Sequence, residues 1–457
     1  MDIMKTDVLI IGAGGGAYPA AFRLARSGYD VVMVDPKGVL GGNCLYLGCI
    51  PSKTIREMIQ LYERSKRLLE ANVGKDFSWY QVHKESVQKI RFEQHNIELS
   101  EFPNVHFLKA TASFKNKNEA LIKQEGKEFS VTFDHCIIAT GTSVARLKFP
   151  GSEFCITSDD IFSYGSSFKK IPESIVIVGA GYIALEIASM FSALGSLVHL
   201  LVRTDVTLRN VDQDLVKMAL PSIARFQMHY NANILEVTKN GSYLSVKYNE
   251  SGKEQEITAD TVIMAVGRDP QLPEGVNSLG IEINQKGFIS TTETLQTTIP
   301  WIYATGDVNG KAPYFHAAVR EAMVAANNII AGDQPVDYID YRNIPVAIFT
   351  FPPIAYVGIT RSSATKIGMK IVEGCYKLCT DSRSQMYDEK EGEIRLFFEK
   401  GSMKIVGGWI FGIDAPDLIN EIGLAVSNSL TARQMAEFAD QHPTTNEGIS
   451  KIARNFV

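Results

Sequence analysis

Two cysteines five residues apart are the side chains of this chain best suited to chemistry. Cys44 and Cys49 belong to a chain of 457 residues with only six cysteines. A redox-active disulfide, two buried thiols and half of a zinc site are the alternatives. Zinc needs further Cys or His ligands at short spacing, and the next cysteine in sequence is Cys136. The flanking residues favour the redox disulfide, because a glycine cluster precedes the pair and Pro51-Ser52-Lys53 follows it.

Two glycine-rich turns of the same form are the second feature. The first holds Gly12 and Gly14 and the second holds Gly179 and Gly181, each between an apolar strand and a helical stretch. Each turn lies in a strand–turn–helix–strand unit of about 30 residues, the context in which G-x-G-x-x-G/A binds a dinucleotide pyrophosphate. One match is a weak signal. Two in full context predict an α/β fold with two Rossmann-like dinucleotide-binding domains.

Together these motifs resemble the pyridine nucleotide-disulfide oxidoreductases, whose members carry GG-x-C-x4-C-x-P after the first glycine turn. The resemblance covers essentially the whole chain in the expected order. It implies FAD as one cofactor, NADP or NAD as the other, and a homodimer. It also implies a domain organisation: 1–150 as the first part of the FAD domain, 151–270 as the NAD(P) domain, 271–337 as the second, central part of the FAD domain, and 338–457 as an α+β dimerisation domain.

The expected flavin site is built around the first turn. Gly14 lets the backbone approach the pyrophosphate, and Asp35, at the end of the second strand, is placed to bind ribose hydroxyls. Asp35 precedes Pro36, so it is alternatively a turn former. The resemblance implies that Asp307 of a Thr-Gly-Asp motif binds the ribityl chain, that the helix around Ala317 points its N-terminus at the flavin ring, and that Gly141 ends a strand of this site.

The resemblance also assigns roles around the disulfide. Cys49 would lie against the flavin and Cys44 would be the outer thiol that attacks the substrate. Lys53 resembles the family lysine near the flavin, with Glu186 as its ion-pair partner, although both are alternatively solvated helix charges. His442 of the His442-Pro-Thr-x-x-Glu447 segment would move the proton, since thiolate is the reactive form.

Glu447 would orient the imidazole of His442. Thr444-x-x-Glu447 also fits a capping box, which is the structural alternative for this segment. In the family this histidine reaches the disulfide of the other subunit, so the homodimer would be the catalytic unit.

The second nucleotide site favours NADP(H) over NAD(H). An NAD site of this family ends its second strand with a carboxylate, and the corresponding residue is Val202. Arg203 and Arg209 match the paired arginines that hold the 2′-phosphate in NADPH-dependent members, and Gly267 ends a strand of this site. Two solvated surface arginines are the alternative.

Among family members the chain is most similar to dihydrolipoamide dehydrogenase. Phe22 stands where glutathione reductases carry an arginine, and the C-terminal residues hold no cysteine pair of the kind that mercuric reductase uses. The substrate would be a small or lipoyl-protein dithiol or disulfide. An NADPH-dependent reductase of another small disulfide is the alternative enzyme, and a docking subunit of a multienzyme complex is the alternative of another class.

Composition bounds the remaining possibilities. The net charge of −5 offers no basic surface for nucleic acid, and no apolar run reaches the roughly 18 residues of a membrane span. No pattern of metal ligands is expected. A paired cysteine motif without a secretion signal predicts a cytoplasmic location, where structural disulfides are rare.

Overall fold

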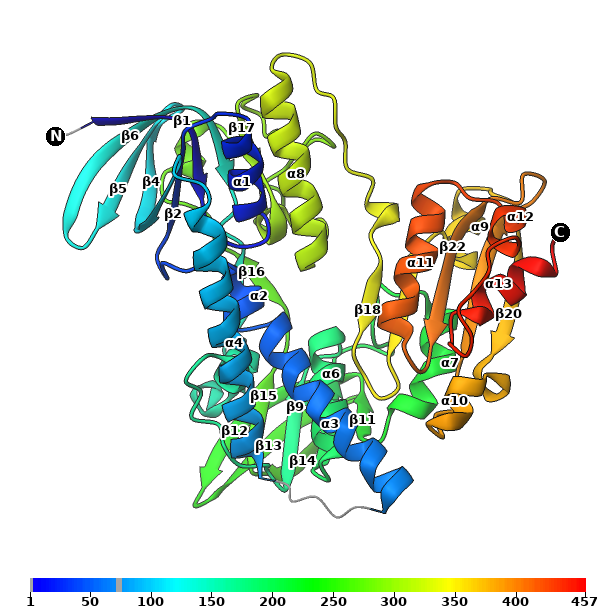
Figure 1. Cartoon of the computed structure of the whole chain (residues 1–457). Helices are drawn as coiled ribbons and strands as arrows, with labels where there is room; N and C mark the ends of the chain where they lie inside the picture. The colour runs from blue at the N-terminus through cyan, green and yellow to red at the C-terminus, as the bar shows by residue number, and fades with distance from the viewer. Residues whose placement is uncertain (1–2, 71–75) are drawn as a thin grey trace.

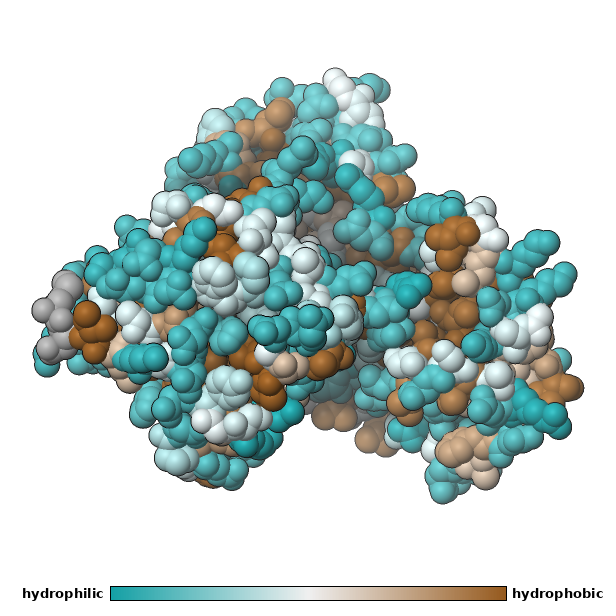
Figure 2. Space-filling model, turned by 90° about the horizontal axis from the view of Figure 1, so that it is seen from above, coloured by the Kyte–Doolittle hydropathy of each residue, from teal (hydrophilic) through white to brown (hydrophobic). Residues whose placement is uncertain are grey.

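The computed structural model describes residues 3–70 and 76–457, which form three lobes (Figure 1). The two α/β lobes lie one above the other, and the third lobe, at the carboxyl end of the chain, lies beside them. Seen from above, a hollow separates this third lobe from the rest of the surface (Figure 2).

The first lobe is a seven-stranded sheet covered by helices on one face. Its parallel part has the order β3-β2-β1-β6-β17, and an antiparallel part continues from β6 through β5 to β4. The strands are β1 Ile3–Ile11, β2 Val31–Asp35, β3 Val105–Lys109, β4 Thr111–Asn116, β5 Glu119–Gln124, β6 Lys127–Ile138 and β17 Ile302–Ala304. Since β17 pairs with β6, a segment distant in sequence completes the first sheet.

Alternation along β1 explains how this sheet is covered. Val8 and Ile10 pack on one side with α1 (Tyr18–Arg26) and α8 (Phe315–Ala331). Leu9 packs on the opposite side with residues of β4 to β6. Strand side chains alternate between faces, so one apolar run supplies two cores.

Three further helices lead out of the first lobe. They are α2 Gly42–Tyr46, α3 Cys49–Leu69 and α4 Phe77–Ser100. The long helices α3 and α4 run side by side from the first lobe down along the second (Figure 1). After α4 the chain returns to β3 of the first sheet, and α3 packs against the second lobe, so these helices connect the two nucleotide-binding folds by contact.

The second lobe repeats the plan of the first. A parallel sheet of order β11-β10-β9-β15-β8 lies next to an antiparallel sheet of β12, β13 and β14. The strands are β8 Ile156–Thr157, β9 Ser174–Val178, β10 Leu197–Val202, β11 Gln227–Tyr230, β12 Ala232–Asn240, β13 Tyr243–Glu250, β14 Lys253–Ala259 and β15 Thr261–Met264, and the helices are α5 Ser158–Phe162, α6 Tyr182–Ala193 and α7 Gln213–Ile223. A two-stranded sheet of β7 (Thr142–Val144) and β16 (Arg268–Pro270) marks both crossings between the lobes.

The two glycine turns have similar φ angles and the same kind of close backbone neighbour. Gly12 has φ +115° and Gly179 has φ +128°, which side chains disfavour. An added Cβ would lie 2.2 Å from the carbonyl oxygen of Ala139 at Gly12, and 2.2 Å from that of Ala265 at Gly179. In each turn the backbone therefore passes against the end of a neighbouring strand at a distance that only glycine allows.

The third lobe is an antiparallel sheet with helices. Its strands have the order β18-β19-β22-β21-β20. They are β18 Val346–Ile348, β19 Ile354–Gly358, β20 Ile371–Lys377, β21 Glu393–Glu399 and β22 Ile405–Phe411, with helices α9 Arg361–Lys366, α10 Ser382–Met386, α11 Ala415–Ser427, α12 Ala432–Ala436 and α13 Glu447–Arg454. The expected fold class, two Rossmann-like domains and an α+β domain, is confirmed, whereas the exact boundaries stay predictions.

Candidate active site

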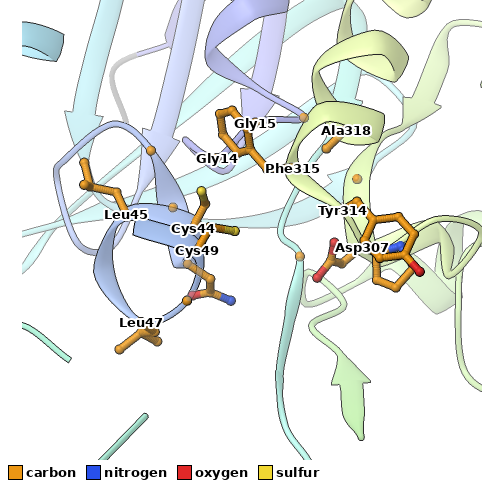
Figure 3. Close-up of a pocket in the computed structure, with 18 of the residues that line it drawn as sticks. Gly14, Gly15, Cys44, Leu45, Leu47, Cys49, Asp307, Tyr314, Phe315 and Ala318 are labelled. Atoms are coloured by element: carbon orange, nitrogen blue, oxygen red, sulfur yellow. The ribbon is translucent and has the colours of Figure 1, made fainter. Parts of the chain in front are cut away.

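Cys44 and Cys49 lie side by side at the start of the connecting helices. Cys44 belongs to α2, and Cys49 is the first residue of α3, whose 21 residues make it one of the longest helices. Both cysteines are free thiols here, and their side chains are hydrogen-bonded to each other. Figure 3 shows both side chains projecting into the same space, on the opposite side from Asp307 and Tyr314.

The two sulfurs differ in acidity. The hydrogen bond from Cys44, more than the opposing burial, lowers the pKa of Cys49, and the positive charge of Lys53 adds to the effect. The same hydrogen bond and burial raise the pKa of Cys44. Since Cys49 begins α3, the helix dipole also favours a negative charge there. In the dithiol form Cys49 is therefore the more acidic of the two thiols.

An ion pair next to Cys49 joins all three lobes. Lys53 Nζ, on α3, lies 2.8 Å from Glu186 Oε2, on α6 of the second lobe. The other oxygen, Glu186 Oε1, accepts a hydrogen bond of 3.0 Å from the backbone N–H of Phe349 in the third lobe. The ammonium group also lies 4.6 Å from the centre of the Phe349 ring. The pair that the resemblance implied is thus present, and the Glu186 side chain is only 8% exposed.

A cavity of about 830 Å³ contains the cysteines and extends along the first glycine turn. Its lining includes the expected residues Gly12, Gly14, Asp35, Cys44, Cys49, Lys53, Gly141, Glu186 and Asp307. An added Cβ at Gly42 would lie 2.7 Å from the Gly14 Cα, so two glycines keep this wall flat. A long cavity with bare backbone at its middle and carboxylates along it fits an extended dinucleotide such as FAD.

The two aspartates of the cavity have distinct settings. The Oδ1 atom of Asp35 accepts a 2.8 Å hydrogen bond from the Lys37 N–H, so Asp35 forms the turn and faces the cavity at once. The Oδ2 atom of Asp307 accepts a 2.9 Å hydrogen bond from the Thr142 hydroxyl. Burial raises the pKa of both carboxyl groups. Hydrogen bonds from ribose or ribityl hydroxyls would compensate for that desolvation.

The helix after Asp307 begins at the wall of the cavity, as expected. Phe315, His316 and Ala318 line the cavity, whereas the Ala317 side chain is fully buried behind this wall. His316 Nε2 lies 2.6 Å from the Pro345 carbonyl oxygen, so its ring is fixed against the third lobe. The expected action of this helix N-terminus on the flavin stays a prediction.

A buried carboxylate that the sequence analysis missed supports this helix. Glu321 is fully buried and accepts hydrogen bonds from the Gly306 N–H at 2.5 Å, from Asn309 Nδ2 at 2.8 Å and from the Tyr341 hydroxyl at 2.8 Å. Burial raises the pKa of Glu321 to about 7. The hydrogen bonds of Glu321 to Gly306 and Asn309 fix the turn that holds Asp307. A signal existed, since Glu321 shares the buried helical face of Ala318, Ala322 and Ala325.

The second nucleotide site adjoins this cavity, since Tyr182 and Arg268, the residues after Gly181 and Gly267, belong to the cavity lining. Gly181 caps α6, Gly267 follows β15, and Arg203 directly follows β10, all at the carboxyl edge of the second parallel sheet. This edge is where ligands bind in open α/β sheets. Arg203 and Arg209 are exposed and make no ion pair with any residue that the structure describes.

His442 does not line the cavity that holds the cysteines of its own chain. It belongs to the segment before α13, and α13 lies in the third lobe, away from α2 (Figure 1). Its side chain is 72% exposed, and its Nδ1 lies 3.0 Å from Glu447 Oε1. The same carboxylate oxygen accepts the Thr444 N–H at 3.1 Å. Glu447 therefore contacts the imidazole and caps the segment at once.

Burial alone would raise the pKa of Glu447, but the hydrogen bonds from the Thr444 N–H and from His442 lower it. The charged form of Glu447 is the one that these hydrogen bonds stabilise. A charged carboxylate at Nδ1 leaves Nε2 as the nitrogen that faces solvent.

The Lys53–Glu186 pair generates a prediction about the acidity of Cys49. Lys53→Met should raise the pKa of Cys49, because the ammonium charge favours the thiolate, and Glu186→Gln should lower it, because a nearby carboxylate disfavours the thiolate. The measurement is the ultraviolet absorbance of the thiolate against pH in a Cys44→Ser background. Lys66→Met, an exposed charge on the same helix, is the control and should change nothing. Shifts of both variants in one direction would contradict this electrostatic account.

Comparisons with known proteins agree with this geometry. Residues 6–322 match the family model "Pyridine nucleotide-disulphide oxidoreductase", and residues 344–453 match its dimerisation domain. A dihydrolipoyl dehydrogenase of Bacillus subtilis is 33% identical over 97% of this chain and 95% of its own. One of Buchnera aphidicola is 32% identical over 99% of this chain and 96% of its own.

Solved structures show the same fold. The LpdA structure from Mycobacterium tuberculosis has a TM-score of 0.89 at 21% identity and covers 99% of this chain and 100% of its own. The HOCl-induced flavoprotein disulfide reductase RclA from Escherichia coli has a TM-score of 0.87 at 22% identity, with both chains fully covered. The dimerisation domain indicates a homodimer. This chain therefore belongs to the pyridine nucleotide-disulphide oxidoreductase family, enzymes that use FAD and NAD(P)H to exchange electrons with a disulfide centre.

Proposed function

We propose that this enzyme transfers two electrons between NADP(H) and a dithiol or disulfide substrate, with dihydrolipoamide as the dithiol. The observation that carries the proposal is the hydrogen-bonded pair of Cys44 and Cys49 inside a cavity shaped for a dinucleotide. The curated relatives named dihydrolipoyl dehydrogenase support the choice of dithiol. A reductase of another small disulfide is the second candidate, favoured by the paired arginines of the second nucleotide site.

Residues of this chain set the charge and the reactivity of the two sulfurs. Reduction of the Cys44–Cys49 disulfide takes two electrons and two protons, and bound FAD would relay the electrons between nicotinamide and disulfide. Lys53 stabilises the thiolate of Cys49, and Cys44 is left to attack the substrate disulfide. Glu186 and Phe349 hold Lys53 in place.

Anaerobic assay with dihydrolipoamide tests the proposed substrate. We expect reduction of the enzyme by dihydrolipoamide and formation of NADPH when NADP is the acceptor. Reduction by NADPH alone, with no reaction of dihydrolipoamide, would exclude this dithiol and leave the second candidate. A cytoplasmic location stays a prediction. Among the residues that the structure describes, no helix is long and apolar enough to cross a membrane.

The roles of the two sulfurs can be separated spectroscopically. Either Cys44→Ser or Cys49→Ser should abolish turnover while FAD stays bound, because the disulfide needs both sulfurs. Cys44→Ser should keep a long-wavelength thiolate–flavin absorbance band that Cys49→Ser lacks, since Cys49 is the thiolate. Cys379→Ser, at an exposed cysteine, should retain full activity. The band in the opposite variant would reverse the assignment of the two sulfurs.

We propose that the proton acceptor of Cys44 is His442 of the partner subunit, oriented by that subunit's carboxylate. The exposed position of His442 and its absence from the cavity lining of its own chain support this. The 3.0 Å contact with Glu447 would stabilise the protonated imidazole once it has taken the proton.

His442→Gln should lower turnover by roughly 10²- to 10⁴-fold, the range of a positioned general acid or base. His106→Gln, an exposed histidine of the first lobe, should not. Hybrid dimers of Cys44→Ser and His442→Gln subunits should regain activity, because each hybrid holds one complete site. Verified hybrids without activity would place the site within one chain.

The second nucleotide site is proposed to bind NADP(H). Val202, at the end of β10, is fully buried, so this strand end offers no carboxylate for a ribose 2′-hydroxyl. Arg203 and Arg209 are two exposed cations without a described ion-pair partner. A 2′-phosphate would be their counter-charge, through charge-assisted hydrogen bonds.

Replacement of both arginines by alanine should lower kcat/KM for NADPH by roughly tenfold to a few hundredfold, since each charged hydrogen bond contributes roughly 1.5–3 kcal/mol before screening. The value for NADH should stay within about twofold. Lys239→Ala removes an exposed charge elsewhere in the lobe and is the control. A parent enzyme that uses NADH as well as NADPH would exclude the proposed preference.

A further inference from the structure

The side of the cavity next to Cys44 carries a cluster of polar groups that none of the roles above uses. Tyr18, Arg91 and His95 line the cavity together with Cys44 and Leu45. Tyr18 is the first residue of α1, and the other two lie on α4. The sequence motifs gave no indication of this cluster.

Helix α4 is fixed directly on the redox segment. Gln88 Nε2 donates to the Leu45 carbonyl at 2.8 Å and to the Tyr46 carbonyl at 3.2 Å. Residues three, four and seven apart share one face of a helix, so Arg91 and His95 continue the face that begins at Gln88. One end of this face is thereby tied to the residue after Cys44.

The other end of the face meets α1. The His95 side chain is 5% exposed, and its ring packs edge-on against the Tyr18 ring at 5.0 Å between centres. His95 Nδ1 lies 3.4 Å from Glu98 Oε2. Arg91 lies between the two anchored ends, at the open mouth of the cavity.

Arg91 supplies the positive charge of this cluster. Its Nη1 donates to Gln94 at 2.7 Å, and it forms no ion pair with any described residue. Burial lowers the pKa of His95, so this imidazole is mostly neutral. Burial also raises the pKa of Tyr18 to about 12, so its hydroxyl remains a donor. Glu98, the carboxylate of the cluster, lies seven residues beyond Arg91, or about 10 Å along the helix.

We propose that Arg91 and Tyr18 bind the carboxylate of an anionic dithiol or disulfide that reacts at Cys44, so that the site prefers acidic substrates to their neutral amides. This inference rests on the proposed exchange of the Cys44 thiol with substrate. A neutral, aliphatic substrate would leave the guanidinium of Arg91 without a counter-charge at the mouth of the cavity. An anion there gains a charge-assisted contact and a phenol hydrogen bond.

Alkylation of reduced holoenzyme tests the site without relying on turnover. Iodoacetate transfers a carboxymethyl group and iodoacetamide a carbamoylmethyl group to the Cys44 sulfur, with loss of iodide and of the thiol proton, and only the first reagent is anionic. The ratio of their rates at Cys44, located by tandem mass spectrometry, should fall about tenfold in Arg91→Met. It should recover in part in Arg91→Lys and fall less in Tyr18→Phe.

Lys89→Met is the matched control, because Lys89 is an exposed charge on the same helix two residues away. An unchanged rate ratio in Arg91→Met, or an equal fall in Lys89→Met, would overturn the proposal. The second result would mean that the helix acts only through its overall charge.

Two dithiols that differ in one group extend the test to substrates. Dihydrolipoate carries a carboxylate where dihydrolipoamide carries an amide. The parent should show the higher kcat/KM for dihydrolipoate, and Arg91→Met should raise KM for the acid about tenfold while kcat and the values for the amide stay unchanged. Preference for the amide in the parent would overturn the inference. If neither dithiol reacts, the proposed dithiol function fails, and the alkylation ratio still decides the role of Arg91.

Discussion

The ion pair between Lys53 and Glu186 is the contact on which the rest of the site depends. It joins α3 of the first lobe to α6 of the second, and the N–H of Phe349 brings the third lobe to the same carboxylate. A pair this shielded from water is costly to break, since one partner would be left without its counter-charge. Lys53 also lies one helical turn from Cys49, and its positive charge lowers the pKa of that thiol. Lys53 therefore takes part both in holding the lobes together and in lowering the pKa of Cys49.

The cavity lies where the Lys53–Glu186 contact brings the three lobes together. Its walls come from all three lobes, with glycine backbone on the first, α6 on the second and the segment from Pro345 to Phe349 on the third. The proposed proton acceptor of Cys44 is not part of this cavity. His442 is an exposed side chain of the third lobe with its carboxylate partner already in place. A second subunit would complete the site, which gives the dimerisation domain a chemical role.

Features that depend on neighbouring residues could be predicted from the sequence, whereas contacts between segments far apart in the chain could not. The turns at Gly12 and Gly179 could be recognised because their constraint is local: a positive φ and a strand end within 2.2 Å of any Cβ. The Cys44–Cys49 pair is local as well. Glu321 and Arg91 were missed because their roles depend on partners far away in sequence. The helix around Ala317 could be placed at the cavity from its motif, but which of its side chains line the wall depends on how the helix packs.

The central claim is that electrons from the nicotinamide reach the Cys44–Cys49 pair. Anaerobic titration of the purified enzyme with NADPH, followed by counting of thiols, tests it most directly. The account predicts two additional thiols per chain after one equivalent of NADPH, both located at Cys44 and Cys49, and none in Cys44→Ser. Full bleaching of the flavin without new thiols would contradict it.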